Sequence, residues 1–356
     1  MILTSANIKR IVFLDYLRVF AFVSVLVGHE FHELLLNVQR SESTHATIKF
    51  LLSVLLPFFN AGAGVTVFFF VSGYIVTHIL QTENPTEFLI KRIFRIYPLY
   101  VFAVLFEYVL AYTINGSIPA LSTLVPQLLL IGQVVDAPLT LGGVEWTLRV
   151  EVMFYALMLL LKLAGLFNTK HQKIQPLVYT VVLIFLYKIS PFPANKTEFV
   201  FAAYSIGLQF LMLGSCFYLL EINRINKKIF AFLFLLIFYQ YYKLTDLYQT
   251  QLLHDNYAAL ALLLFFTMWV CRKKFEISKE IIYLSDLTYA IYLFHVLVYN
   301  FLIHIIIQNS FVISQRNYIL LYLTVLFVFC STVMYAVEKP SIKLGKKILS
   351  KLPINR

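Results

Sequence analysis

The sequence is short of charged residues. Only 13% of its 356 residues are Asp, Glu, Lys or Arg, whereas 60% are hydrophobic. Soluble globular domains carry about 25% charged residues, so this composition excludes an ordinary water-soluble enzyme. Apolar runs of about 20 residues recur along the chain, and a helix of that length crosses the hydrocarbon core of a bilayer. The composition therefore predicts an integral membrane protein.

Cysteine and the common catalytic motifs are also scarce. The three cysteines, Cys216, Cys271 and Cys330, stand singly, which predicts neither a disulfide framework nor a metal site. Motifs of nucleotide hydrolases, dinucleotide-binding folds, zinc metallopeptidases and serine-hydrolase nucleophile elbows are missing from the sequence. We therefore predict no metal site. We expect any active site to be built by the membrane spans and their adjoining loops.

Hydropathy predicts an all-α, polytopic membrane protein with about ten transmembrane helices. Helices are expected because lipid offers no hydrogen-bond partners to an unpaired backbone. We expect a single transmembrane domain over residues 1–356, with no fused soluble domain and no cleavable leader. A further short or re-entrant helix is expected at 48–59. The predicted spans are 11–29, 62–80, 97–113, 146–164, 176–190, 199–220, 229–242, 256–271, 284–307 and 318–337.

Basic residues alternate between the two sides of these spans. Segments on one side hold 21 Lys and Arg residues, alternate segments hold six, and Arg18 and Arg149 lie within spans, which accounts for all 29. Since cytoplasmic loops are enriched in Lys and Arg, both termini are predicted to be cytoplasmic. The net charge of +11 is then mainly a topology signal, and we predict no nucleic-acid partner.

The first predicted span carries three ionisable residues, Asp15, Arg18 and His29. Such residues are costly in hydrocarbon, so they indicate function. In an α-helix the eleven residues from Arg18 to His29 give a rotation of about 1,100°, about 20° from three full turns, and a rise of roughly 16 Å. Both side chains are therefore predicted on one face, and Asp15 can pair with Arg18 at i, i+3. A structural Asp–Arg pair with an interfacial histidine is the alternative.

Four other stretches contain candidate site residues. Arg92 and Arg95 stand at i, i+3 near the cytoplasmic end of the third span, where Pro98 suits a first helical turn. Arginine forks bind phosphates well, although ordinary membrane anchoring explains this spacing too. In the fourth span, Arg149 is placed to neutralise Glu145 at i, i+4.

Glu151 would then need another partner, and an imidazole would serve, because a carboxylate supports a histidine that acts as a general base. The second span has four small residues that suit close helix packing, namely Gly62, Gly64, Ser72 and Gly73, and Ser72 also suits a substrate path. His295 is a second intramembrane imidazole, for which a helix–helix hydrogen bond is the alternative.

Six stretches, in order, resemble landmarks of the membrane acyltransferase-3 family over about residues 11–340. They are "FLDYLRVFAFVSVLVGHEF", "GVTVFFFVSGYIV", "FLIKRIFRIYPLY", "EWTLRVEVMFY", "LSDLTYAIYLFH" and "EKP". The resemblance implies a ten-helix domain in the bacterial inner membrane. It also implies transfer of an acyl group, usually acetyl, from cytoplasmic acetyl-CoA to a hydroxyl of a cell-surface glycan or lipid-linked saccharide. The chain differs from the family's usual pattern at two positions: it has Thr66 and Val152 where relatives commonly have acidic residues.

The resemblance implies roles for particular residues. The family's catalytic arginine and histidine correspond to Arg18 and His29, its arginine pair to Arg92 and Arg95, and its Trp-x-Leu-x-Val-Glu motif to Trp146 and Glu151. We predict His29 as the general base, or as an acylated intermediate, with Arg18 and Glu151 as catalytic partners. Arg92, Arg95 and Arg18 are predicted to bind the phosphates of CoA. Supporting roles fall to Asp15, Trp146, His295 and Ser72.

Two other classes of function remain open from the sequence. A polytopic transporter or flippase of lipid-linked saccharides also explains buried charges, and it predicts substrate movement without consumption of acetyl-CoA. A binding or assembly scaffold predicts that His29 and Arg18 tolerate neutral replacement. The order of the six stretches favours the transferase.

Overall fold

The computed structural model describes residues 10–116, 120–132, 137–189, 198–248 and 255–352. All regular secondary structure in these ranges is helical, as the all-α prediction requires. The chain divides into two compact units: Met1–Pro85 with Val150–Ser285, and Thr86–Arg149 with Asp286–Arg356. We describe each unit by itself.

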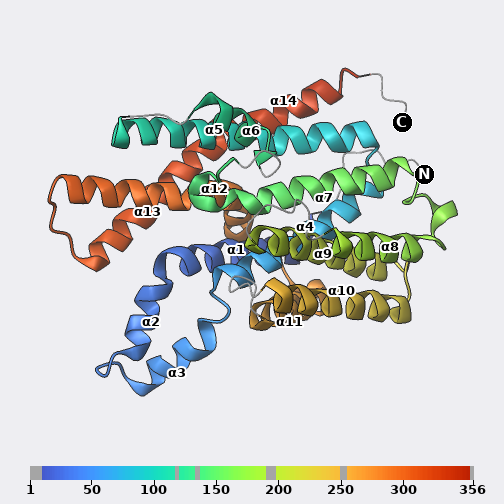
Figure 1. Cartoon of the computed structure of the whole chain (residues 1–356), viewed down its shortest axis with the longest axis horizontal. Coiled ribbons are helices and arrows are strands. Elements are labelled where there is room, and N and C mark those ends of the chain that lie inside the picture. Colours follow the sequence, from blue (N-terminus) through green and yellow to red (C-terminus); the bar gives the residue numbers. More distant parts are fainter. Residues whose placement is uncertain (1–9, 117–119, 133–136, 190–197, 249–254, 353–356) are drawn as a thin grey trace. The chain divides into compact units, whose positions relative to one another are not determined.

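The first unit contains a bundle and a helical hairpin. Its helices are α1 (Val12–Leu26), a π turn (Val27–Phe31), α2 (His32–Arg40), α3 (Ala46–Leu55), α4 (Ala61–Leu80), α8 (Gln175–Lys188), α9 (Glu198–Glu221), α10 (Lys227–Tyr248) and α11 (Asp255–Val270). The chain changes direction between α1 and α2, and α2 and α3 form the hairpin (Figure 1). The expected short helix at 48–59 is present as α3.

Helix α4 lies at the centre of this unit and packs against α1, α9 and α11. Glycines allow the close contacts, as the small residues of α4 predict. A Cβ at Gly73 would stand 1.9 Å from the carbonyl oxygen of Leu211, and one at Gly214 would stand 2.1 Å from that of Phe70. A Cβ at Gly64 would meet the backbone of α1 at 2.6 Å. The backbones of these helices therefore touch directly.

The second unit is held by aromatic packing. It contains α5 (Pro85–Asn115), α6 (Leu121–Leu128), α13 (Gln315–Val333), a second π turn (Met334–Glu338) and α14 (Lys339–Leu349). Two further helices, α7 (Glu145–Leu163) and α12 (Lys279–Gln308), run across the boundary between the units. The rings of Phe106, Phe294 and Phe329 meet with centroids 5.0–5.9 Å apart and join α5, α12 and α13.

Among the described residues, seven helices are long and apolar enough to cross a membrane. They are Val12–Arg40, Ala61–Leu80, Pro85–Ile114, Ala203–Glu221, Lys227–Leu247, Lys279–Gln308 and Gln315–Leu349. The other three predicted spans coincide with helices α7, α8 and α11, so the count of ten and the cytoplasmic placement of the termini stay predictions. The chain is thus a multi-pass membrane protein.

Candidate active site

Asp15 anchors the start of the first span. Its carboxylate is buried and accepts hydrogen bonds from Arg10 at 2.6 and 2.9 Å and from the hydroxyl of Ser285 at 2.7 Å. The predicted pairing with Arg18 is present, but at 3.8 Å it is the longer contact. From the sequence, Arg10 is only one of the basic residues that indicate topology. No sequence pattern shows that Arg10 lies closer to Asp15 than Arg18 does.

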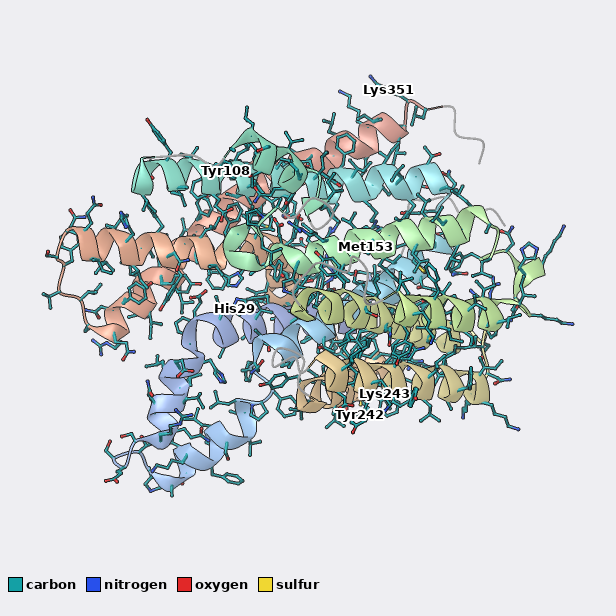
Figure 2. The ribbon with its side chains drawn as sticks, in the orientation of Figure 1. His29, Tyr108, Met153, Tyr242, Lys243 and Lys351 are labelled. Carbon is teal, nitrogen blue, oxygen red and sulfur yellow. The ribbon has the colours of Figure 1, made fainter. Side chains whose placement is uncertain are left out.

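His29 lies in the π turn Val27–Phe31 rather than in an α-helix. A π turn holds more residues than an α turn, so each residue advances by less than 100°. His29 therefore lags behind the direction predicted from eleven α-helical steps after Arg18, and the prediction that both side chains share one face stays a prediction. The imidazole is exposed, and Figure 2 shows it where α1 gives way to α2.

The π turn is packed against the start of α4. A Cβ at Gly28 would stand 2.2 Å from the backbone nitrogen of Ala61, so a larger residue does not fit there. The hydroxyl of Ser24 lies 2.8 Å from the carbonyls of both Phe58 and Asn60, and Asn60 caps α4 by accepting from the N–H of Gly62. These contacts fix the position of the turn that carries His29.

Glu151 is held by two hydroxyl groups in the first unit. Ser72 and Tyr155 each donate to its Oε1 at 2.5 Å, and the carboxylate is buried. Both hydroxyls give this buried carboxylate hydrogen-bond partners, which buried polar groups require. The sequence predicts an imidazole as the partner of Glu151; in the described part of the chain its hydrogen bonds go to hydroxyls instead. Ser72, a predicted supporting residue, faces this carboxylate.

The arginine pair lies in the second unit, well inside α5. The helix begins at Pro85, so Pro98 is an interior residue, and the prediction that it opens the helix is wrong. An interior proline lacks the N–H that would bond to the carbonyl four residues earlier, here that of Phe94. The hydroxyl of Ser341 in α14 donates to this carbonyl at 3.0 Å. Tertiary packing therefore satisfies the group that Pro98 leaves unpaired. The guanidinium of Arg92 lies over the ring of Phe88, 5.5 Å from its centroid.

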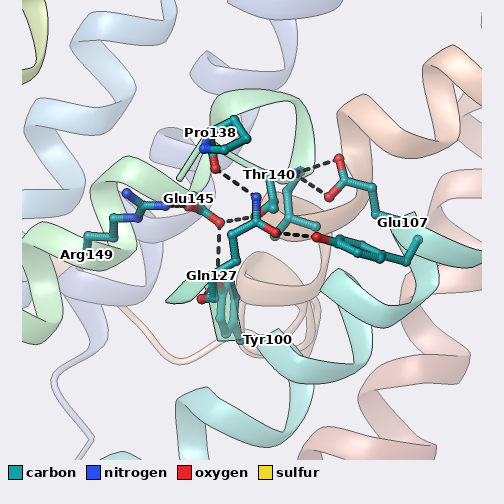
Figure 3. Close-up of polar contacts among 9 residues, drawn as sticks. Tyr100, Glu107, Gln127, Pro138, Thr140, Glu145 and Arg149 are labelled. Carbon is teal, nitrogen blue, oxygen red and sulfur yellow. Dashed lines mark hydrogen bonds and ion pairs between the residues drawn. The ribbon is translucent and has the colours of Figure 1, made fainter. Parts of the chain in front are cut away.

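A buried ion pair opens α7 in the second unit. Arg149 pairs with Glu145 at i, i+4, as the spacing predicts, and neither side chain is more than 2% exposed. Thr140 also donates to the carboxylate, and Tyr100 lies 3.0 Å from it. Trp146 follows in the first turn of α7 and is half-buried. Figure 3 shows this network with its outer members.

Glu107 and Gln127 are network members that sequence reasoning missed. Tyr108 donates to the amide oxygen of Gln127 at 2.7 Å, and the amide nitrogen donates to the carbonyl of Pro138 at 2.8 Å. Both carboxylate oxygens of Glu107 lie 2.9 Å from the N–H of Leu141. A lone acid in the apolar run "AVLFEYVLAY" was the available signal for Glu107.

The segment that meets Glu107 has an unusual backbone. Leu141, Gly142 and Gly143 have φ angles of +56°, +66° and +90°. Two of these three positions are glycines, which adopt positive φ without steric cost. At Gly142 there is a second requirement, because a Cβ would stand 2.2 Å from the side chain of Val296 in α12. The turn between α6 and α7 is therefore fixed against α12, one residue after His295.

His295 is buried and its tautomer can be assigned from its contacts. Nδ1 lies 3.1 Å from the carbonyl of Ile291 and 2.9 Å from that of Tyr292, so it carries the proton and donates. In the neutral ring Nε2 is then the acceptor nitrogen. Both of these carbonyls belong to α12 itself, and the backbone carbonyl of His295 accepts a helix–helix hydrogen bond from the hydroxyl of Tyr322 in α13 at 3.2 Å. Tyr292 in turn donates to the carbonyl of Val144 at 2.6 Å.

The predicted site residues thus fall into two sets. Asp15, Arg18, His29, Ser72 and Glu151 belong to the first unit, and the remaining four belong to the second, namely Arg92, Arg95, Trp146 and His295. Within the first unit the structure joins Asp15 to Arg18 and Ser72 to Glu151.

Comparison with known proteins gives one match. Residues 11–336 match an acyltransferase-3 family model described as an acyltransferase domain. No curated protein and no solved structure matches the chain. The match includes residues of both units and ends before α14.

Proposed function

Because the chain belongs to the acyltransferase-3 family, we propose that it transfers an acyl group, usually acetyl, from cytoplasmic acyl-CoA to a hydroxyl of a glycan. The acceptor is a cell-surface glycan or a lipid-linked saccharide, and the site of action is a bacterial inner membrane. The observation that carries this proposal is an imidazole, His29, in an apolar span of a chain that matches the family over residues 11–336.

His29 is proposed to act as the general base. It takes the proton of the acceptor hydroxyl while the hydroxyl oxygen attacks the thioester carbonyl. The bond between carbonyl carbon and sulfur then breaks, and the CoA thiolate leaves with the proton from His29. The products are an acylated acceptor and free CoA. The π turn and its contact with Ala61 support this role, because they hold the histidine backbone in one place.

The other predicted residues have positioning or binding roles in this proposal. Asp15 fixes the start of the helix that carries Arg18 and His29, through its bonds to Arg10 and Ser285. Glu151 supplies a buried carboxylate for the protonated imidazole, and Ser72 holds that carboxylate in place by a hydrogen bond. Arg92, Arg95 and Arg18 hold the phosphates of CoA by charge-assisted hydrogen bonds. In the second unit, Nε2 of His295 accepts a hydrogen bond from the acceptor, and Trp146 lines its path.

The test is transfer of labelled acetyl groups to surface glycans. A strain that lacks the gene is complemented with the wild type, with His29→Ala or with His32→Ala, and glycans are analysed by mass spectrometry. We expect His29→Ala to lower acylation by at least about a hundredfold, the usual contribution of general acid–base catalysis. His32 lies three residues later, at the start of α2, and serves as the matched imidazole control.

Protein level in the membrane is measured for each variant. Acylation by His29→Ala at wild-type level would remove His29 from catalysis. Glycan movement that continues without any acyl mass change in the wild type would favour a transporter instead.

A further inference from the structure

Helices α2 and α3 form a hairpin that joins two spans of the first unit. The hairpin begins at the π turn Val27–Phe31, which follows α1, and it ends before α4. The hydroxyl of Ser24 in α1 lies 2.8 Å from the carbonyl of Phe58, and the ring centroids of Phe20 and Phe59 are 5.8 Å apart. Both ends of the hairpin are therefore attached to the last turns of α1.

The exposed side of α3 is apolar. Its large hydrophobic side chains are 45–67% exposed, and they are Ile48, Phe50, Leu51, Val54 and Leu55, which we call the α3 face. At 100° per residue these five side chains occupy an arc of about 160°, centred opposite the half-buried Lys49. Thr47 is the one polar residue within that arc.

The exposed side of α2 is mainly polar. Glu33, Asn37 and Arg40 are exposed and lie within about 60° of one another around the helix, and Val38 is the one exposed apolar residue. The two helices pack against each other. One helix of the hairpin thus presents polar groups and the other presents apolar groups, which is the arrangement of helices that lie in a membrane interface.

The length of α3 and the positions of its neighbours indicate what covers the α3 face. The helix has ten residues, which is about 15 Å, and the hydrocarbon core is about 30 Å thick, so α3 cannot cross it. The helix that contains α1 and the helix α4 are both long and apolar enough to cross a membrane. The hairpin therefore leaves the bilayer at the end of one span and returns to it at the start of the next.

The charge of the hairpin indicates which force acts on it. Residues 32–55 contain two acids, Glu33 and Glu42, and two bases, Arg40 and Lys49, so their formal charges cancel. Attraction to charged headgroups is then not what holds the hairpin, and burial of the apolar α3 face is the remaining driving force.

We propose that the α3 face lies in lipid, at the boundary between the headgroups and the acyl chains of one leaflet, and that α2 faces water. The π turn at the start of the hairpin carries His29, and Gly28 in this turn touches Ala61 at the start of α4. Contact of α3 with lipid therefore holds the turn at the level of the membrane surface. The inference rests on the hairpin and not on the proposed acyl transfer.

The experiment compares spin labels on the two helices of the full chain in nanodiscs of zwitterionic lipid. Leu51→Cys and Val54→Cys place labels on the α3 face, and Asn37→Cys places one on the exposed side of α2 as the matched control. Every variant also carries Cys271→Ser, because Cys271 is the one native cysteine that is not buried. Collision rates of the labels are measured with oxygen, which dissolves in lipid, and with a neutral nickel chelate, which stays in water.

We expect the labels at residues 51 and 54 to collide more often with oxygen than with the chelate. The label at residue 37 should show the reverse order, so the logarithm of the ratio of the two collision rates changes sign between the helices. Because the lipid is zwitterionic, this result needs no attraction to anionic headgroups.

Several results would overturn the proposal. Preference for the chelate at all three positions would place the α3 face in water, and preference for oxygen at all three would contradict the orientation of the hairpin. Low collision rates with both reagents at residues 51 and 54 would mean that protein covers the face. Dipolar broadening between labels would then identify a second copy of the chain, and its absence would identify another part of the same chain. Acyl transfer is not measured, so none of these results bears on the proposed function.

Discussion

Ser341 and Phe94 lie 247 residues apart, and the hydroxyl of the first donates to the carbonyl of the second. The bond exists because Pro98 has no N–H to offer that carbonyl. It joins α14 to α5 within the second unit.

The dependence on Pro98 can be measured with a double-mutant cycle. Ser341→Ala should lower the free energy of unfolding by about 1 kcal/mol, the net value of a typical hydrogen bond. In the Pro98→Ala background the loss should be less than half as large, because the backbone N–H that this substitution restores then serves the carbonyl. Unfolding in detergent by denaturant measures both values.

The cycle contains its own control. Ser341 also lies 2.8 Å from the carbonyl of Glu338, and any loss from that contact is the same in both backgrounds. Equal losses in the two backgrounds would show that the bond to Phe94 does not depend on the proline.

The ion pair of Arg149 with Glu145 offers a comparison between a buried and a partly exposed pair of the same spacing. Arg149→Met should cost about 3–5 kcal/mol of stability, because it leaves a buried carboxylate without its cation. Lys91→Met breaks the i, i+4 pair with Glu87, whose side chains are 25% and 19% exposed, and it should cost less than about 1 kcal/mol. Denaturant unfolding of both variants checks the difference.

A companion variant separates charge from packing. Adding Glu145→Gln to Arg149→Met removes the unpaired charge and should recover part of the lost stability. No recovery would mean that the loss comes from packing of the arginine side chain.

Two replacements of His295 distinguish its two nitrogens. Asparagine can still donate to the carbonyls of Ile291 and Tyr292, as Nδ1 does, but it offers nothing at the position of Nε2. Glutamine reaches the position of Nε2. Because the proposed role belongs to Nε2, we expect His295→Asn to lose at least about tenfold in acyl transfer, and His295→Gln to keep most of it.

Initial rates of acyl transfer, measured for both variants at equal protein level in the membrane, test this expectation. The reverse order, with Asn active and Gln inactive, would assign His295 a purely structural role through Nδ1.

Local spacing predicted the parts of the site that lie within one helix. Glu145 and Arg149 are spaced i, i+4, and Asp15 and Arg18 are spaced i, i+3. Both ion pairs are present in the structure. The small residues of α4 predicted its close packing, confirmed at Gly64 and Gly73. Hydropathy placed every predicted span on a helix because burial in lipid dictates both the pattern and the secondary structure.

Contacts between distant segments could not be predicted in this way. Tyr155 lies one helical turn after Glu151, but nothing local selects Ser72 as the second donor. The π turn at His29 leaves no mark in composition, and its contact with α4 joins residues 33 positions apart, Gly28 and Ala61. The prediction that Pro98 opens a helix fails because α5 continues through the proline. The carbonyl of Phe94, which Pro98 leaves without its N–H partner, accepts a hydrogen bond from Ser341, and no sequence rule identifies a partner 243 positions after the proline.

The two π turns determine which kinds of mutation change the direction of the side chains that they carry. Each makes its helix longer in sequence without a matching gain in height, and each holds ionisable residues, among them His29 in one and Glu338 in the other. Deletion of one residue before His29 in its turn would restore a regular α-helix. The imidazole would then point in a different direction around the helix, whereas the number and direction of the spans would stay the same. Insertions and deletions within these turns are therefore changes that redirect both groups without altering the number of spans.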